Sequence, residues 1–405
     1  MNSQPRADIM IYDAVRTPRG KGREGGGLAA VKPVELVRQL IDALAERQGG
    51  VVRRPDHLML GCVGQVGVQG GHIALVSKLY AGLSQETTAW TVNNFCVSGL
   101  SAVLGAADKV AAGNGDLILA GGVESMSQVP FLADKASYYA DSEFSAQLHY
   151  IPVALAADVL AFKEGIGRAT LDAIAARSHQ RAGAAQQAGL GQQSLVPVKG
   201  PGGAVVLNRD EYVRGNTTVE GLATFEPAFA EMGKHYAPVL KDALGLDHID
   251  HVLTVTQCPG MADGAGLALV GSAAAGAAHG LKPRAEILAY AEASGDPVLS
   301  LTAGRTAMHR ALEKAGLALG DIDLIEYMEA FAVVPALFER DCKVDPGKVN
   351  VFGGHIARGH ALGASGAILL STLIDAMEAK DAETGLLVTF AASGIGSAII
   401  LRRSI

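Results

Sequence analysis

A polar turn between a β-rich run and a helix of small residues constrains the fold more than any other feature of this chain. The run covers 89–92, the turn contains Cys96, and an Ala-rich apolar segment extends from 100 to 112. This order predicts a strand, a tight turn and a buried helix that carries the thiol in its first turn. Unpaired N–H groups at a helix start favour thiolate over thiol. For this segment alone, the plainer interpretation of Cys96 as a small buried apolar residue stays open.

Strand-like runs alternate with helical segments on both sides of this unit. The expected strands cover 9–15, 57–66, 117–120, 285–290, 324–327 and 384–390, and the expected helices cover 33–45, 73–83, 303–314 and 364–377. This rhythm predicts βαβ units and a largely parallel sheet. From 127 to 261 the pattern changes, with more aromatic residues, a helix expected over 170–188 and a strand expected over 251–255. We interpret this segment as a large excursion from the first domain.

The bulk composition excludes several classes of protein. The 405 residues carry a net charge of −7, which argues against a nucleic-acid surface or an anionic membrane partner. The four cysteines form no CxxC pair and predict reduced thiols in a cytoplasm, without a disulfide framework, and the histidines show no metal-ligand spacing. Residues 1–6 lack the apolar core of a signal peptide, and no run approaches the ~20 apolar residues of a membrane span.

A second notable loop, 350–367, is rich in glycine and contains His360 shortly before a helix start. The positive end of a helix disfavours imidazolium, so the ring is expected to be neutral and able to accept a thiol proton. Together with Cys96 it predicts a nucleophile–base pair. A histidine merely bonded to backbone stays open for the loop alone. His355 lies nearer the chemistry than the histidines outside this loop, but Arg358 equally suggests a turn that is solvated or faces a ligand.

Several motifs in the same order resemble the thiolase family of acyl-CoA C-acyltransferases along nearly the whole chain. They lie at 16–18 (Arg-Thr-Pro), 93–100 around Cys96, 120–127, 212–229 and 353–366 around His360. The resemblance implies an α/β thiolase fold of two pseudo-duplicated halves, layered α-β-α-β-α, with a large inserted loop domain. The implied parts are 1–127 completed by 252–281, the loop domain 128–251 that contacts CoA, and 282–405. It also implies a homodimer or homotetramer, and an accessory subunit as a further partner stays open.

The resemblance further implies the chemistry. Cys96 would carry the acyl group as a thioester, and His360 would activate the thiol. Backbone N–H groups of Cys96 and Ala392 would stabilise the oxyanion, at about 3 kcal/mol for each donor. The reaction would cleave a 3-oxoacyl-CoA with CoA as co-substrate, or run backwards as a Claisen condensation, without a permanently bound cofactor. Arg214 is the candidate contact for the phosphate or adenine of CoA, although a plain surface arginine is the alternative.

The departures from the family pattern limit this implication. Met328 stands where thiolases carry an asparagine that positions a catalytic water, and Phe390 stands where they carry a second cysteine. The segment Cys258-Pro259-Gly260 replaces the usual Ser-Gly of the substrate loop, and residues 234–250 are extra sequence. One hypothesis is that Cys258 supplies the missing acid–base function, and the alternative is a buried apolar thiol.

These apolar replacements favour an unusual or bulky acyl substrate. Two other functions stay open. One is a condensing or acyl-transferring relative that works without the second cysteine, and the other is a non-catalytic subunit of a complex. Retention of both Cys96 and His360 speaks against the non-catalytic alternative.

Overall fold

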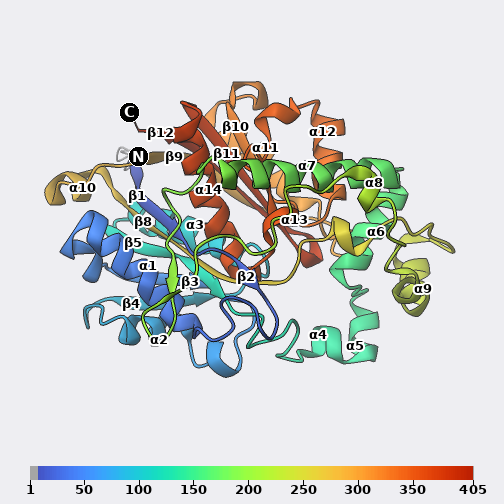
Figure 1. The fold of residues 1–405 in the computed structure, drawn as a ribbon, viewed down its shortest axis with the longest axis horizontal. Coiled ribbons are helices and arrows are strands. Elements are labelled where there is room, and N and C mark those ends of the chain that lie inside the picture. Colours follow the sequence, from blue (N-terminus) through green and yellow to red (C-terminus); the bar gives the residue numbers. More distant parts are fainter. Residues whose placement is uncertain (1–7, 405) are drawn as a thin grey trace, which may run out of the picture.

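The computed structural model describes residues 8–404, so the prediction that residues 1–6 are no signal peptide lies outside it. Ten strands form one continuous sheet (Figure 1). Their bounds are β1 (Ile9–Arg16), β2 (Gly20–Lys21), β3 (His57–Gly61), β4 (Thr88–Val92), β5 (Leu117–Glu124), β8 (Ala262–Ser272), β9 (Ala285–Ser294), β10 (Leu324–Tyr327), β11 (Thr384–Ala391) and β12 (Ile395–Arg403). A separate hairpin pairs β6 (Val198–Lys199) with β7 (Val205–Leu207).

The strand order confirms the pseudo-duplication. The first half runs β4-β3-β5-β8-β1, and the second runs β10-β11-β12-β9, with Val349 bridged to Ile325 beyond β10. We count that bridge as a strand and number the strands of each half from 1 to 5 in chain order. The order of neighbouring strands across the sheet is then 3-2-4-5-1 in both halves. The halves join edge to edge, because β1 pairs with β9.

The expectation of a largely parallel sheet is wrong. Among the described strands, parallel pairing is limited to β3 with β4, β3 with β5, and β10 with β11, apart from isolated bridges such as that of Val349 with Ile325. The last strand of each half, β8 or β12, runs antiparallel to both of its neighbours. For β12 the reason is local: it follows β11 after the short turn Ala392–Gly394, and a chain that reverses in so few residues can pair only antiparallel.

Helices cover both faces of each half and complete the α-β-α-β-α layering. The buried helices α3 (Ser98–Ala111) and α14 (Ser365–Ala379) contact strands of both halves and form the central layer (Figure 1). The outer layers contain α1 (Pro33–Gln48) and α2 (Ile73–Tyr80) on the first half, and α11 (Ala303–Ala315) and α12 (Val333–Cys342) on the second. The stretch Leu362–Ala379 is long and apolar enough to cross a membrane, but 89% of it is buried inside the fold as a core helix.

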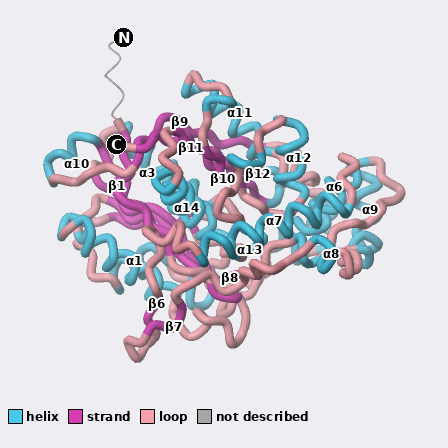
Figure 2. The backbone as a smooth tube through the Cα atoms, turned by 45° about the horizontal axis from the view of Figure 1, so that its top comes forward, coloured by secondary structure: helices cyan, strands magenta, loops and turns pink. Residues whose placement is uncertain are grey.

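The segment between β5 and β8 forms the excursion that the sequence predicts. Its helices gather mainly at one end of the molecule, while α7 extends back across it (Figure 2). They are α4 (Ser137–Ala140), α5 (Ser142–Gln147), α6 (Val153–Lys163), α7 (Arg168–Gln187), α8 (Val219–Leu222) and α9 (Ala230–Leu244). The short helices α10 (Ala273–His279) and α13 (His355–Arg358) lie elsewhere. The exact domain boundaries stay a prediction.

Two predicted strands differ from the structure for a visible reason. No strand forms over 251–255, because the buried Asp158 carboxylate accepts the backbone N–H groups of Val252 and Leu253, at 3.0 and 2.9 Å, in place of a neighbouring strand. The strand expected over 57–66 ends at Gly61, because the chain turns there and the Glu124 carboxylate accepts the N–H groups of Val63 and Gly64.

Candidate active site

Cys96 lies in the turn between β4 and α3, two residues before the helix begins. The preceding residue, Phe95, has φ +48°, a left-handed conformation that strains a residue with a side chain by ~1–3 kcal/mol. The Ser98 hydroxyl holds this turn: it accepts the Asn94 N–H at 2.8 Å and donates to the Phe95 carbonyl at 2.5 Å. The predicted strand, turn and helix are therefore confirmed, but the prediction that the first turn of the helix carries the thiol is wrong: Cys96 lies in the strained turn before the helix, which hydrogen bonds hold in place.

His360 lies between α13 and α14 and is held on both sides of its backbone. Its N–H donates to the Gly260 carbonyl at 2.8 Å, and the Ala262 N–H donates to its carbonyl at 3.1 Å. The ring nitrogen Nδ1 lies 2.8 Å from the Ser365 hydroxyl at the start of α14. Because Nδ1 is engaged there, Nε2 is the nitrogen left for chemistry.

Glycines bring the loops that carry Cys96 and His360 into direct backbone contact. A Cβ added to Gly99 in α3 would stand 2.6 Å from the Gly363 carbonyl oxygen, and one added to Gly122 in β5 would stand 2.2 Å from the same atom. Real Cβ atoms do not approach so closely, so only glycine fits at these two positions. The glycine density of both loops thus serves their close packing.

Glu124 ties the loop of His360 to the turn that follows β3, and the sequence interpretation did not single it out. Its fully buried carboxylate accepts N–H groups of Val63, Gly64 and Gly363 at 2.9–3.0 Å and the Gln69 side-chain amide at 2.8 Å. Burial raises the pKa of this carboxyl, and the four donors oppose that rise. The only signal was its place in the motif 120–127, directly after a fully apolar run.

Cys96 and His360 line one cavity of about 520 Å³. Its wall is mainly apolar and aromatic, and among the described residues that line it there is no lysine or arginine. The aromatic side chains come largely from the excursion: Phe131, Tyr138, Tyr139, Tyr150, Phe229 and, from the loop after β10, Phe331. A cavity of this size matches a drug-sized organic group.

Burial keeps both reactive groups neutral. It raises the pKa of the Cys96 thiol to about 12, although the nearby backbone N–H of Ala392 lowers the pKa against that effect. It lowers the pKa of His360 to about 3, with a further contribution from the nearby Arg19 cation. The expected resting thiolate is therefore wrong, because loss of hydration outweighs the helix start. The neutral imidazole is as expected, but burial rather than the helix dipole is its main cause.

Met328 and Phe390 offer no proton carrier. Both are buried, and the Met328 sulfur accepts the Phe390 backbone N–H at 3.4 Å. The Phe390 ring lies 5.0 Å from that of Tyr327, and a Cβ on Gly304 in α11 would stand 2.5 Å from it. The ring thus packs into the layer between the sheet and α11, although Phe390 also borders the cavity.

Cys258 is a second thiol in the same cavity. Its Sγ donates to the Thr254 carbonyl at 3.2 Å. Burial raises the pKa of this thiol to about 12, and the Asp158 carboxylate adds to that rise. Cys258 is therefore a neutral thiol that is engaged by backbone in the structure.

A buried ionic cluster supports the loop of His360. Asp210 accepts hydrogen bonds from Arg16 at 2.9 Å and Arg358 at 2.5 Å, and its oxygen lies 3.6 Å from Arg19 Nε. Arg19 also donates to the Gly359 carbonyl at 3.1 Å, directly before His360. The three guanidinium groups outweigh the effect of burial and hold the pKa of Asp210 well below its usual range.

The expectation of a solvated or ligand-facing turn at 355–358 is wrong. Arg358 is buried within the ionic cluster, and His355 is fully buried. The His355 ring lies 5.0 Å from the His360 ring, edge to face. Both side chains thus pack inside the fold, where Arg358 donates to Asp210 and to the Phe352 carbonyl, whereas neither ring nitrogen of His355 has a hydrogen-bond partner.

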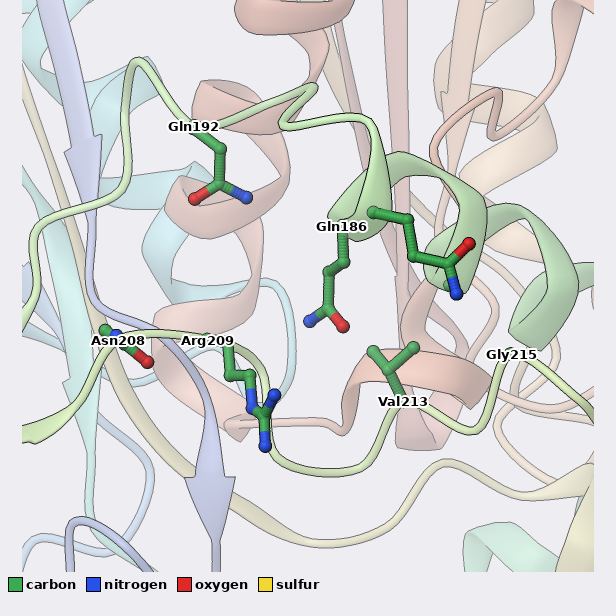
Figure 3. Close-up of a pocket in the computed structure, with 8 residues that line it drawn as sticks. Gln186, Gln192, Asn208, Arg209, Val213 and Gly215 are labelled. Carbon is green, nitrogen blue, oxygen red and sulfur yellow. The ribbon is translucent and has the colours of Figure 1, made fainter.

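Arg214 does not line the catalytic cavity. Its neighbours Val213 and Gly215 border a separate cavity of about 550 Å³ beside the end of α7 (Figure 3). Amide side chains and Arg209 surround that cavity, and none of the predicted catalytic residues borders it. Arg214 is exposed, and its contact with CoA stays a prediction.

The remaining candidates for metal or disulfide chemistry are simple to describe. All four cysteines are free thiols. Within residues 8–404, no group of three or more His, Cys, Asp or Glu side chains is arranged to hold a metal ion.

Family comparisons agree with this geometry. The family model described as "Thiolase, N-terminal domain" matches residues 9–239, and "Thiolase, C-terminal domain" matches 281–403. The chain is 35% identical to a β-ketoadipyl-CoA thiolase of Pseudomonas knackmussii, over 98% of this chain and 99% of that protein. It is 36% identical to a 3-ketoacyl-CoA thiolase of Cronobacter sakazakii, with the same coverage.

A solved structure is also similar over its full length. The crystal structure of the acetyl-CoA acetyltransferase of Bacillus anthracis superposes with a TM-score of 0.86 at 29% identity, covering 99% of this chain and 100% of that one. The similarity therefore extends to the whole fold, including the segment between the two matched domains.

Proposed function

The chain belongs to the thiolase family and is an acyltransferase of that type, and from this premise we propose that it transfers its acyl group through Cys96. The proposed reaction is cleavage of a 3-oxoacyl-CoA by CoA, or the reverse condensation. One observation carries the proposal: the Cys96 thiol, the His360 imidazole and Ala392 line the same mainly apolar cavity.

The proposed steps follow from the positions of these groups. The Cys96 sulfur attacks the C3 carbonyl carbon while His360 accepts the thiol proton. The N–H groups of Cys96 and Ala392 donate to the oxygen as it gains negative charge; one such donor is typically worth about 10²–10³ in rate. The C2–C3 bond then breaks as the C3 carbonyl re-forms; its electron pair and one proton pass to C2, and the C1–C2 fragment leaves as its CoA ester. Finally the CoA thiol attacks the thioester, its proton returns to the Cys96 sulfur, and the shortened acyl-CoA leaves.

The proton that C2 receives needs a carrier, and Met328 and Phe390 cannot supply it. We propose two ways in which the site works without them. His360 returns the proton that it took from Cys96, or Cys258 acts as a second acid, since it borders the same cavity. A Cys258→Ser variant that keeps full turnover would exclude the second route.

The absence of a proton carrier at Met328 and Phe390 favours one alternative function, that of an acyl-transferring or condensing relative that uses Cys96 and His360 alone. Such an enzyme would still form the Cys96 thioester, but it would pass the acyl group on without cleaving a 3-oxoacyl-CoA. Product analysis separates the two functions, because only thiolysis consumes a 3-oxoacyl-CoA in a CoA-dependent way.

The cavity supports a bulky, uncharged acyl group. Its volume of about 520 Å³ exceeds the needs of an acetyl group, and its wall is aromatic. Because no lysine or arginine lines it among the described residues, it offers no cation to the terminal carboxylate of a β-ketoadipyl group. We therefore place the substrate among neutral, bulky 3-oxoacyl-CoA esters.

We also propose a homodimer formed through β4. This strand ends the sheet, so one of its edges carries unpaired backbone groups that a second copy can extend. Large apolar side chains gather beside it in α2 and on β4 itself: Leu79 is 67% exposed, Tyr80 50% and Trp90 49%. Sedimentation of the purified protein tests this, and a monomer or a need for an accessory subunit would contradict it.

A substrate panel tests the proposed function. Acetoacetyl-CoA, 3-oxohexanoyl-CoA and 3-oxo-3-phenylpropionyl-CoA are incubated with CoA, and the shortened products are measured for the native chain and Cys96→Ala. We expect turnover that is lost in Cys96→Ala and is higher with the bulkier esters. The absence of CoA-dependent cleavage for every ester, together with a Cys96 adduct, would favour the alternative acyl-transferring function.

A further inference from the structure

The turn Ala392–Gly394 presents a backbone donor to Cys96 in an unusual conformation. Ser393 has φ +61° and Gly394 has φ +72°, both in the left-handed region. Glycine adopts such angles without strain, whereas serine does so only when its surroundings hold it there. Ala392 directly precedes this strained residue and lines the same cavity as Cys96, and its backbone N–H lowers the pKa of the Cys96 thiol.

Three hydrogen bonds hold the turn in that shape. Two come from the neighbouring segment: the Ser393 N–H donates to the Ser300 hydroxyl at 3.0 Å, and the Gly295 N–H donates to the Gly394 carbonyl at 2.7 Å. The third joins the Ser393 and Tyr138 hydroxyls at 2.7 Å, and Tyr138 stands 255 positions earlier in the chain, in α4.

We propose that Tyr138 is a positioning residue for acyl transfer, which holds Ser393 in its left-handed conformation and so keeps the Ala392 N–H directed at Cys96. The inference rests on the proposed function of Cys96. Tyr138 acts through the turn and not on the reacting atoms. Its role differs from that of the two local bonds, because it links the turn to the inserted segment.

This link joins the acyl cavity to the oxyanion donor. The Tyr138 ring packs edge to face against Tyr150 at 5.0 Å and Tyr139 at 6.3 Å, and all three rings border the cavity. An acyl group that displaces the tyrosines pulls on Ser393, whereas one that fits between them leaves the turn in place. The tyrosines that contact the acyl group therefore also control how well the Ala392 N–H is directed at Cys96.

The test begins with Tyr138→Phe, which keeps the ring and removes only the hydroxyl. Complete removal of an oxyanion donor costs about 10²–10³ in rate, so a loosened donor should cost about tenfold. We expect the rate of Cys96 acylation by 3-oxo-3-phenylpropionyl-CoA to fall about tenfold while KM changes less than twofold. Tyr236→Phe is the matched control, because that tyrosine lies in α9 outside the cavity lining.

Ser393→Gly tests whether Tyr138 acts through the turn. Glycine adopts the left-handed conformation without a clamp, so Tyr138→Phe should cost less than twofold in the Ser393→Gly background. If Tyr138→Phe costs the same with serine and with glycine at 393, the proposal is overturned.

A second readout is independent of acyl transfer. The Ala392 N–H stabilises the thiolate form of Cys96, so Tyr138→Phe should slow the alkylation of Cys96 by iodoacetamide at pH 8 severalfold, as measured on the Cys96 peptide by mass spectrometry. Ser393→Gly should restore the rate. An unchanged alkylation rate in Tyr138→Phe would overturn the proposed role of Tyr138, whether or not the native chain transfers an acyl group. A native chain that transferred no acyl group would instead count against the proposed function.

Discussion

The loops that carry Cys96 and His360 occupy equivalent places in the two halves, but they are held by different means. Each loop follows the third strand position of its half and precedes a buried central helix. The Cys96 turn is held locally by the Ser98 hydroxyl, whereas the His360 loop is held by Arg19 of the first half and Asp210 of the inserted segment. The duplicated scaffold therefore sets where the two groups stand, and the rest of the chain sets what each can do.

The same contrast appears in their protonation. Burial raises the pKa of the acid Cys96 and lowers that of the base His360, so the pair rests as thiol and imidazole. An ion pair between them would be poorly hydrated in this cavity, and Arg19 further opposes an imidazolium. We infer that proton transfer accompanies attack on the substrate.

The largest effect should come from removing the base. In His360→Asn the thiol loses its proton acceptor, so turnover should fall about 10³-fold, within the usual range of general-base catalysis. The measurement is CoA-dependent cleavage of a 3-oxoacyl-CoA under saturating substrate. A fall of less than tenfold would show that the two loops do not work as a pair.

Substitution of Asp210 tests whether the buried ionic cluster supports the His360 loop. Asp210→Asn leaves three buried arginines without their shared counter-charge, which should cost ~3–5 kcal/mol of stability. Thermal unfolding measures the loss. Asp42→Asn is the control, because its ion pairs with Arg38 and Arg53 are partly exposed and should contribute less than about 1 kcal/mol. Equal losses in the two variants would contradict a special role for the buried cluster.

The buried imidazole also predicts how stability depends on pH. Between pH 6.5 and about 3 the unfolded chain binds a proton at His360 that the folded chain does not, so stability should fall as the pH decreases through this window. The contribution of one such group is at most about 1.4 kcal/mol per pH unit. Thermal midpoints at pH 7, 6 and 5 should therefore fall more steeply in the native chain than in His360→Asn. Identical slopes would indicate an exposed imidazole.

The smallest effect should come from a residue outside both loops. If Arg214 contacts CoA, Arg214→Ala should raise KM for CoA about threefold, as expected for loss of one exposed ionic contact, and leave kcat unchanged. Initial rates at varied CoA decide this. A changed kcat with constant KM would mean that Arg214 acts on the chemistry instead.

Much of the fold follows from local pattern. The apolar run at β5, the helical periodicity of α1 and the small-residue helices α3 and α14 were all predicted, because periodicity and composition are local properties. The antiparallel directions of β8 and β12 were missed, since strand direction depends on how the chain returns to the sheet. The strand expected over 251–255 failed because Asp158, 94 positions from Val252, captures its backbone.

The site divides in the same way. Cys96 and His360 could be predicted, because the turn and glycine residues that mark each of them are its neighbours in the chain and because the motifs occur in the expected order. Glu124, Asp210 and Tyr138 could not, because their roles depend on partners that only the folded chain brings near: Gly363, Arg358 and Ser393. The protonation of Cys96 was mispredicted because burial, which dominates it, is a property of the whole fold.

The most direct test of the account is the mass of Cys96 during the reaction. The native chain is mixed with a bulky 3-oxoacyl-CoA without free CoA, digested under acid, and analysed by mass spectrometry, with Cys96→Ala as control. We predict an acyl adduct on the Cys96 peptide that disappears when CoA is added and is absent from the Cys258 peptide. An unmodified Cys96 peptide alongside product formation, or an adduct that CoA cannot discharge, would contradict acyl transfer through Cys96.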